Sequence, residues 1–168
     1  MSEKPCTILG IDPGTKVTGY GIVQTDGQDY TLIDFGCIRP RPALSLHVRF
    51  GLIHEGIATL LNRYSIDALS VETQFIGRNV QSALKLGMAR AVAILAATRE
   101  NIPVYEYSPR KAKLSIVGTG GATKDQVKKM VQTLLNLKDP PQPEDAADAL
   151  ALALCHAHSI KAVPCLNT

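Results

Sequence analysis

The chain has 168 residues, of which 45% are apolar and 20% are charged, and its net charge is +3. This composition is ordinary for a globular protein, and the length fits a single domain, residues 1–168, with a real hydrophobic core. The mildly basic charge neither requires nor excludes a polyanionic partner.

The first third of the chain is predicted to form an antiparallel meander followed by a helix. Strands are expected at residues 6–12, 17–24 and 30–38. The connecting sequences DPGTK and TDGQD have the composition of turns, and Asp26-Gly27 marks a hairpin. After the breaker RPRPALS, apolar residues recur at helical spacing. They are Leu46, Phe50, Ile53, Ile57, Leu60 and Leu61.

The rest of the chain alternates helices and strands. Strands are expected at 66–72 and 102–107, and helices at about 79–100, 108–117, 124–137 and 142–160. Thr123 and Gln126 have the spacing of a capping box for the third of these helices. This order predicts an α/β fold with a mixed five-stranded sheet flanked by helices, in which the first three strands are antiparallel and the later strands parallel to the first.

Acids occupy unusual positions in this pattern. Asp12 and Glu72 each end an apolar strand, so parallel neighbouring strands would present both at one sheet edge, where open α/β sheets place their sites. Asp145 and Asp148 lie three apart on one face of the last helix, among alanines. Four converging carboxylates favour Mg²⁺, which takes oxygen ligands and is shared with substrate phosphates. Ordinary strand-end and helix-cap acids are the alternative, especially for Asp145.

A basic segment accompanies the acids. Residues 108–129 hold six basic residues and only Asp125 as an acid, which gives the segment a charge of +5. The basic residues are Arg110, Lys111, Lys113, Lys124, Lys128 and Lys129. Lysines that contact phosphates beside acids that hold metal are typical of a nuclease, and a solvated helix face is the alternative. The loop GTGGATK lacks the spacing of a nucleotide phosphate loop, so no ATP site is predicted.

Cysteine usage and the N-terminal sequence favour a reducing compartment. The four cysteines are widely spread and form no C-x-x-C pair, so no disulfide framework is expected. Cys155, His156 and His158 could be imagined as metal ligands, but ordinary residues near a helix end are the better interpretation. The start MSEKPC lacks a signal-peptide apolar run, and the longest apolar run, ALALAL, is too short to span a membrane. We expect a cytoplasmic protein without a membrane partner.

The motifs LGIDPGTKVTGYGIV, VETQF, SALKLGMARAVAI and DAADALALA resemble, in order, the RuvC family of Holliday junction resolvases. The similarity covers about residues 7–160. It implies an RNase H-like fold and a Mg²⁺-dependent endonuclease with two ions per active site. It also implies a homodimer that makes two symmetric cuts in four-way junction DNA, together with separate RuvA and RuvB type branch-migration proteins. The catalytic and metal-binding acids then fall on Asp12, Glu72, Asp145 and Asp148.

The resemblance also assigns DNA-binding residues. Lys113 and Lys124 match family lysines near the site, and Phe75 falls where the family places an aromatic ring at the junction, with Arg78 beside it. A core aromatic is the alternative for Phe75. Apolar and small residues on one face of the 79–100 helix would pack against a twin helix or, alternatively, cover the sheet. They are Leu84, Gly87, Met88, Ala91 and Leu95.

Three other functions share parts of this sequence pattern. Actin-like ATPases and sugar kinases share a loop resembling IDPGT, but they need two lobes and a second phosphate loop, for which 168 residues are too few. An RNase H-type nuclease acting on RNA–DNA hybrids would have the same fold and carboxylates. A non-catalytic nucleic-acid binder is disfavoured, because four acids repel phosphate unless metal is bound.

Overall fold

The computed structural model describes residues 4–73 and 79–162 and contains a five-stranded sheet of order β3-β2-β1-β4-β5. The strands are β1 (Cys6–Asp12), β2 (Thr18–Thr25), β3 (Tyr30–Ile38), β4 (Ala68–Glu72) and β5 (Val104–Tyr107). β1, β2 and β3 pair in antiparallel fashion, β4 pairs parallel with β1, and β5 parallel with β4. The predicted α/β fold with a mixed sheet is confirmed.

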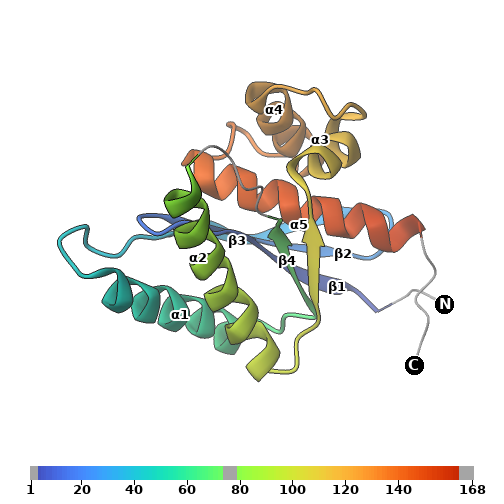
Figure 1. Ribbon diagram of the computed structural model, residues 1–168. Helices are drawn as coiled ribbons and strands as arrows, with labels where there is room; N and C mark the ends of the chain where they lie inside the picture. Colours follow the sequence, from blue (N-terminus) through green and yellow to red (C-terminus); the bar gives the residue numbers. More distant parts are fainter. Residues whose placement is uncertain (1–3, 74–78, 163–168) are drawn as a thin grey trace.

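Helices cover both faces of the sheet (Figure 1). They are α1 (Leu46–Arg63), α2 (Val80–Arg99), α3 (Pro109–Val117), α4 (Lys124–Leu134) and α5 (Glu144–Ala162). α5 lies across one face and contacts β1 and β2, and α3 and α4 pack on the outer side of α5. α1 and α2 lie together on the other face.

The two hydrophobic cores follow from the alternation of side chains along the strands. Ile8 on β1 and Val23 on β2 join a core with α3, α4 and α5. Leu9 and Ile11, their neighbours on β1, join a second core with α1 and α2. All four residues are fully buried. A one-residue change of strand register would therefore exchange the two cores.

Some element boundaries differ from the predicted ones. The strand expected at 66–72 begins at Ala68. Just before it, the Asp67 backbone N–H donates to the Thr7 carbonyl oxygen and the Asp67 carboxylate accepts the Thr7 N–H, both at 2.8 Å. The helix expected at 124–137 ends at Leu134, and Asn136 adopts a left-handed conformation with φ 50°. The last helix spans 144–162 rather than 142–160. The capping box of Thr123 and Gln126 is present as predicted.

Helix α2 is apolar in composition although it contains no long uninterrupted apolar run. Among the described residues it is the one helix long and apolar enough to cross a membrane, judged by length and composition alone. Its Ala93, Ala96 and Ala97 are buried in the core shared with α1. Core helices also meet this criterion of length and composition. The burial of these alanines therefore accounts for part of the apolar character of α2.

Candidate active site

The alternation of side chains brings Asp12 and Glu72 to the same face of the sheet. On β1, Gly10 faces the backbone of α5. On β4, the Ser70 hydroxyl donates a hydrogen bond to the Leu152 carbonyl of α5 at 2.8 Å. Asp12 and Glu72 stand two residues further along these parallel neighbouring strands, at their carboxyl ends. Both acids therefore emerge on the α5 side of one edge, as predicted.

Glycines in β1 and β2 let α5 approach the sheet closely. A β-carbon on Gly19 would overlap the Asp145 carbonyl oxygen, and one on Gly10 would overlap the Ala149 carbonyl oxygen. At Gly21 it would lie 2.7 Å from the Leu150 side chain. Only the absence of side chains allows the first turns of α5, which carry Asp145 and Asp148, to lie beside Asp12.

These positioning glycines were missed in the sequence. A detectable signal was present, because the strand register pairs Gly10 with Gly21 and Asp12 with Gly19. A patch of glycine across two predicted neighbouring strands indicates a closely approaching backbone.

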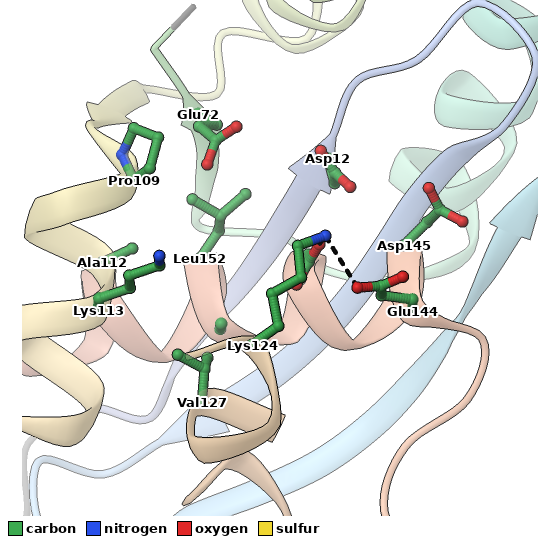
Figure 2. A pocket seen from close by; sticks show the side chains of 12 residues that line it. Asp12, Glu72, Pro109, Ala112, Lys113, Lys124, Val127, Glu144, Asp145 and Leu152 are labelled. Carbon is green, nitrogen blue, oxygen red and sulfur yellow. Dashed lines mark hydrogen bonds and ion pairs between the residues drawn. The ribbon is translucent and has the colours of Figure 1, made fainter. Parts of the chain in front are cut away.

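All four acids and both predicted lysines line one cavity of about 390 Å³ (Figure 2). The acids come from β1, β4 and α5, and the lysines from α3 and α4. Glu144 also lines it, and the sequence analysis did not identify this residue. The full lining comprises Asp12, Glu72, Pro109, Ala112, Lys113, Lys124, Val127, Glu144, Asp145, Asp148, Ala151 and Leu152.

Burial and mutual repulsion make the cavity a strong attractor of positive charge. Burial, followed by repulsion from Asp148, Glu72 and Asp145, raises the pKa of Asp12 from 3.8 to about 7. Burial is also the leading cause that raises the pKa values of Glu72 and Asp148. A cation bound here would relieve the repulsion that these shifts report.

Lys124 partly neutralises the acids. Its Nζ lies 2.9 Å from Glu144 Oε1 and 3.4 Å from Asp148 Oδ2. The hydrogen bond to Glu144 is the leading cause that raises the pKa of Lys124, and it lowers the pKa of Glu144. Lys113 points into the same cavity (Figure 2). It forms no ion pair within the described part of the chain, so its ammonium group is available to a ligand.

The acids suit a hard divalent cation by chemistry and location, since carboxylate oxygens are the ligands of Mg²⁺. As the side chains lie, however, no group of three or more His, Cys, Asp or Glu residues is arranged to hold a metal ion in the described ranges. Asp148 is instead engaged by Lys124. The donor set therefore fits Mg²⁺, whereas the side-chain orientations do not form a coordination sphere.

The histidines near the end of α5 have structural partners. His156 is buried, and its Nδ1 lies 2.7 Å from the Tyr107 hydroxyl, while its ring stacks on Tyr105. His158 Nδ1 lies 2.9 Å from the Ser115 carbonyl oxygen. These contacts give both histidines structural partners, as expected for ordinary residues near a helix end.

Two predicted DNA-binding residues, Phe75 and Arg78, lie outside the described residues. Nearby, Asn79 caps α2, and its side chain accepts the Ser82 backbone N–H at 3.1 Å. On α2, the predicted apolar stripe does not cover the sheet. Leu84 is 64% exposed, and a β-carbon on Gly87 would meet nothing within 4 Å. The stripe is therefore an accessible surface.

Comparison with known proteins gives consistent matches over nearly the whole chain. Residues 8–156 match the family model described as crossover junction endodeoxyribonuclease RuvC. The protein of that name from Protochlamydia amoebophila is 56% identical over 150 residues, 89% of each chain. That from Dehalococcoides mccartyi is 46% identical over 92% of each chain. The structure of Thermus thermophilus RuvC with a Holliday junction substrate superposes with a TM-score of 0.89 at 35% identity, covering 94% of this chain and 96% of that one. The fold is thus RNase H-like, as predicted.

Proposed function

Because the chain belongs to the RuvC family of crossover junction endodeoxyribonucleases, we propose that it resolves Holliday junctions by paired, symmetric, Mg²⁺-dependent hydrolysis of phosphodiesters in DNA recombination and repair. The observation that carries the proposal is the meeting of Asp12, Glu72, Asp145 and Asp148 with Lys113 and Lys124 in one cavity. Acids that bind metal beside lysines that bind phosphate supply both requirements of a nuclease site.

Asp12, Glu72, Asp145 and Asp148 would hold the metal. When bound, two divalent ions supply charge that activates the attacking water and stabilises the leaving oxygen of the phosphodiester. The acids themselves must be ionised to act as ligands. Since the pKa of Asp12 lies at about 7 in the metal-free site, occupation requires Asp12 to release its proton. Metal affinity should therefore rise with pH through neutrality.

The lysines would hold the DNA. Lys113 faces the cavity without an ion pair among the described residues, so it can contact a phosphate directly. Lys124 is oriented by Glu144 and Asp148. If Asp148 were a metal ligand, Lys124 would keep its contact with Glu144 and its ammonium group could also contact a phosphate in the cavity. The two lysines thus have different roles, one always available and the other coupled to metal binding.

The exposed stripe on α2 supports a homodimer. Val80, Leu84, Met88 and Leu95 are between 48% and 64% exposed on one helix. Such residues gathered on one surface indicate an interface. A twofold dimer buries the same patch from both protomers and relates two identical cavities by symmetry. Two such cavities would give paired cuts in a four-way junction. Family membership alone supports RuvA and RuvB type partners.

The test compares a synthetic four-way junction, a linear duplex and an RNA–DNA hybrid, each with and without Mg²⁺. We expect paired cuts in the junction only, and only with Mg²⁺. Asp12→Asn should abolish cutting but retain junction binding, because phosphate contacts dominate affinity. Asp139→Asn, in an exposed loop, is the matched control and should cut normally. Cleavage of the hybrid but not of the junction would favour the RNase H-type alternative.

A further inference from the structure

The segment after β3 reaches the same sheet edge as the acids. β3 is antiparallel to β2, and β2 to β1, so β3 runs in the direction of β1. The register aligns Asp12 with Gly19 and Gly19 with Cys37. Cys37 is thus two strand spacings, about 10 Å, from Asp12. Arg39 follows two residues later, on the side of the acids away from β5, α3 and Lys113.

This segment is rich in arginine and contains no acid. From Phe35 to His54 the chain contains three arginines and no acid. Arg39 and Arg41 are exposed, and with Ile38, Pro40, Leu44 and Leu52 they line a hollow of about 420 Å³. Lys16, in the turn after β1, is also exposed. None of these three basic residues forms an ion pair with another residue in the described ranges.

A hydrogen bond joins this segment to the turn after β1, and electrostatic interactions at Cys37 link it to the acids. Arg49 Nη1 donates a hydrogen bond to the Thr15 carbonyl oxygen at 3.1 Å, which ties the start of α1 to the turn that carries Lys16. Besides burial, electrostatic interactions with Arg39 and with the Asp145 and Asp12 carboxylates shift the pKa of the Cys37 thiol. Burial raises the pKa of this thiol, Arg39 lowers it and both acids raise it. The basic segment and the acids therefore share one neighbourhood.

We propose that Lys16, Arg39 and Arg41 form a second phosphate-binding surface, here called the β3-edge surface, which holds the DNA backbone on the opposite side of the acids from Lys113. The inference rests on the proposed function. From β3 to β5 the sheet edge spans four strand spacings, about 19 Å. At roughly 3.4 Å of helix axis per nucleotide, a duplex lying along this edge spans five or six nucleotides of each strand. The central phosphates meet the acids and the outer ones require cations at both ends.

The residue types favour phosphate over an acidic protein. Arginine guanidinium groups bind phosphate oxygens through two parallel hydrogen bonds. Three unpaired cations that continue an edge already lined by Lys113 and Lys124 match the regular negative charge of a DNA backbone. The proposal commits to that occupant, and binding of an acidic protein instead is an outcome of the test.

The test measures the affinity for a synthetic four-way junction over a range of salt concentrations, with a chelator present to prevent cutting. The test variant is Arg39→Gln/Arg41→Gln. The matched control, Lys4→Gln/Arg99→Gln, removes the same charge. These two residues lie at the opposite ends of the strands, where β1 begins and α2 ends. Loss of two phosphate contacts should flatten the slope of log K against log[salt] by about 1.8, because each contact contributes about 0.9. The control should keep the wild-type slope.

The outcomes separate this inference from the proposed function. If wild-type protein neither binds nor cuts the junction, the proposed function fails. If it does both, and the arginine double variant keeps the wild-type slope while melting normally, the β3-edge surface does not contact DNA and the inference is overturned. Weaker binding with an unchanged slope also overturns it, since this indicates an indirect effect. An unchanged slope together with unchanged junction affinity would leave another anion, such as an acidic protein, as the occupant of the surface, and this too overturns the inference.

Discussion

Gly19 on β2 faces the backbone carbonyl of Asp145 on α5 so closely that no β-carbon fits between them. This contact fixes where the helix begins over the sheet, and with it the distance from Asp145 and Asp148 to Asp12. The geometry of the acidic cavity therefore depends on a residue that has no functional group.

We predict that Gly19→Ala removes cleavage and lowers stability by about 1–3 kcal/mol, the usual cost of inserting a methyl group into a packed region. Gly51→Ala is the matched control. Gly51 lies inside α1, and a β-carbon there would meet nothing within 4 Å. It should cut normally and gain about 0.5–1 kcal/mol from the better helix propensity. Denaturant melts and junction cleavage measure both effects, and normal cleavage by Gly19→Ala would contradict the positioning role.

The sequence predicted those parts of the site that depend on strand periodicity. Asp12 and Glu72 end apolar strands, and the parallel pairing of β1 with β4 follows from the order of elements, so their meeting was predictable. The ion pair of Lys124 with Glu144 was not, because it joins separate helices whose relative position depends on packing. The glycine patch on β1 and β2 indicates that some backbone approaches closely, but a strand pattern does not show that this backbone belongs to α5.

A second prediction concerns the pH dependence of stability without metal. The folded-state pKa of Asp12, about 7, exceeds its ordinary value of 3.8. Between these two pH values the folded protein holds a proton on Asp12 that the unfolded chain releases. The contribution of Asp12 to the free energy of unfolding is therefore present below pH 3.8 and is lost as pH rises through 7. The loss is at most about 4 kcal/mol, shared among the interacting acids. In a chelator, Asp12→Asn should become increasingly more stable than wild type between pH 4 and 7. A constant difference would mean that Asp12 does not titrate in this range.

A third prediction has the opposite sign. Burial lowers the pKa of His156 from 6.5 to about 4. As pH falls, the unfolded chain binds a proton on His156 before the folded protein does. The contribution of neutral His156 to the free energy of unfolding is therefore complete above pH 6.5, and about 3 kcal/mol of it is lost as pH falls toward 4. His156→Phe leaves the Tyr107 hydroxyl without this partner and should be less stable at neutral pH, but this component of acid sensitivity should disappear. His47→Gln, at an exposed position, should retain it. Equal acid sensitivity in all three proteins would contradict the assignment.

A fourth prediction tests the α2 stripe. Leu84→Glu places a charge in the proposed interface, and in a twofold dimer it does so on both protomers. We expect the dimer dissociation constant, measured by sedimentation equilibrium, to rise at least about tenfold, which corresponds to 1.4 kcal/mol. Leu114→Glu is the control, because Leu114 is similarly exposed at 54% but lies on α3, across the sheet. A monomeric wild-type protein, or equal weakening by both changes, would rule out this interface.

The final prediction joins electrostatics to metal binding through Asp148. Bound Mg²⁺ stabilises the folded state by RT ln(1 + [L]/Kd), which is about 1.4 kcal/mol at 10 mM Mg²⁺ if Kd is about 1 mM. For a protein of this size the melting temperature should rise by about 3–5 °C. Asp148→Asn removes a carboxylate that Lys124 only partly neutralises. Without metal it should be at least as stable as wild type, because one source of repulsion is gone. With metal it should gain less.

Melting curves at several Mg²⁺ concentrations and constant ionic strength separate this binding from general screening. Glu100→Gln, at the exposed end of α2, removes one acid away from the cavity and should show the full wild-type response. An equal Mg²⁺ response in Asp148→Asn and wild type would mean that Asp148 does not hold metal. The Lys124–Asp148 contact would then serve only to attach α4 to α5, since no ion would compete with the lysine for that carboxylate.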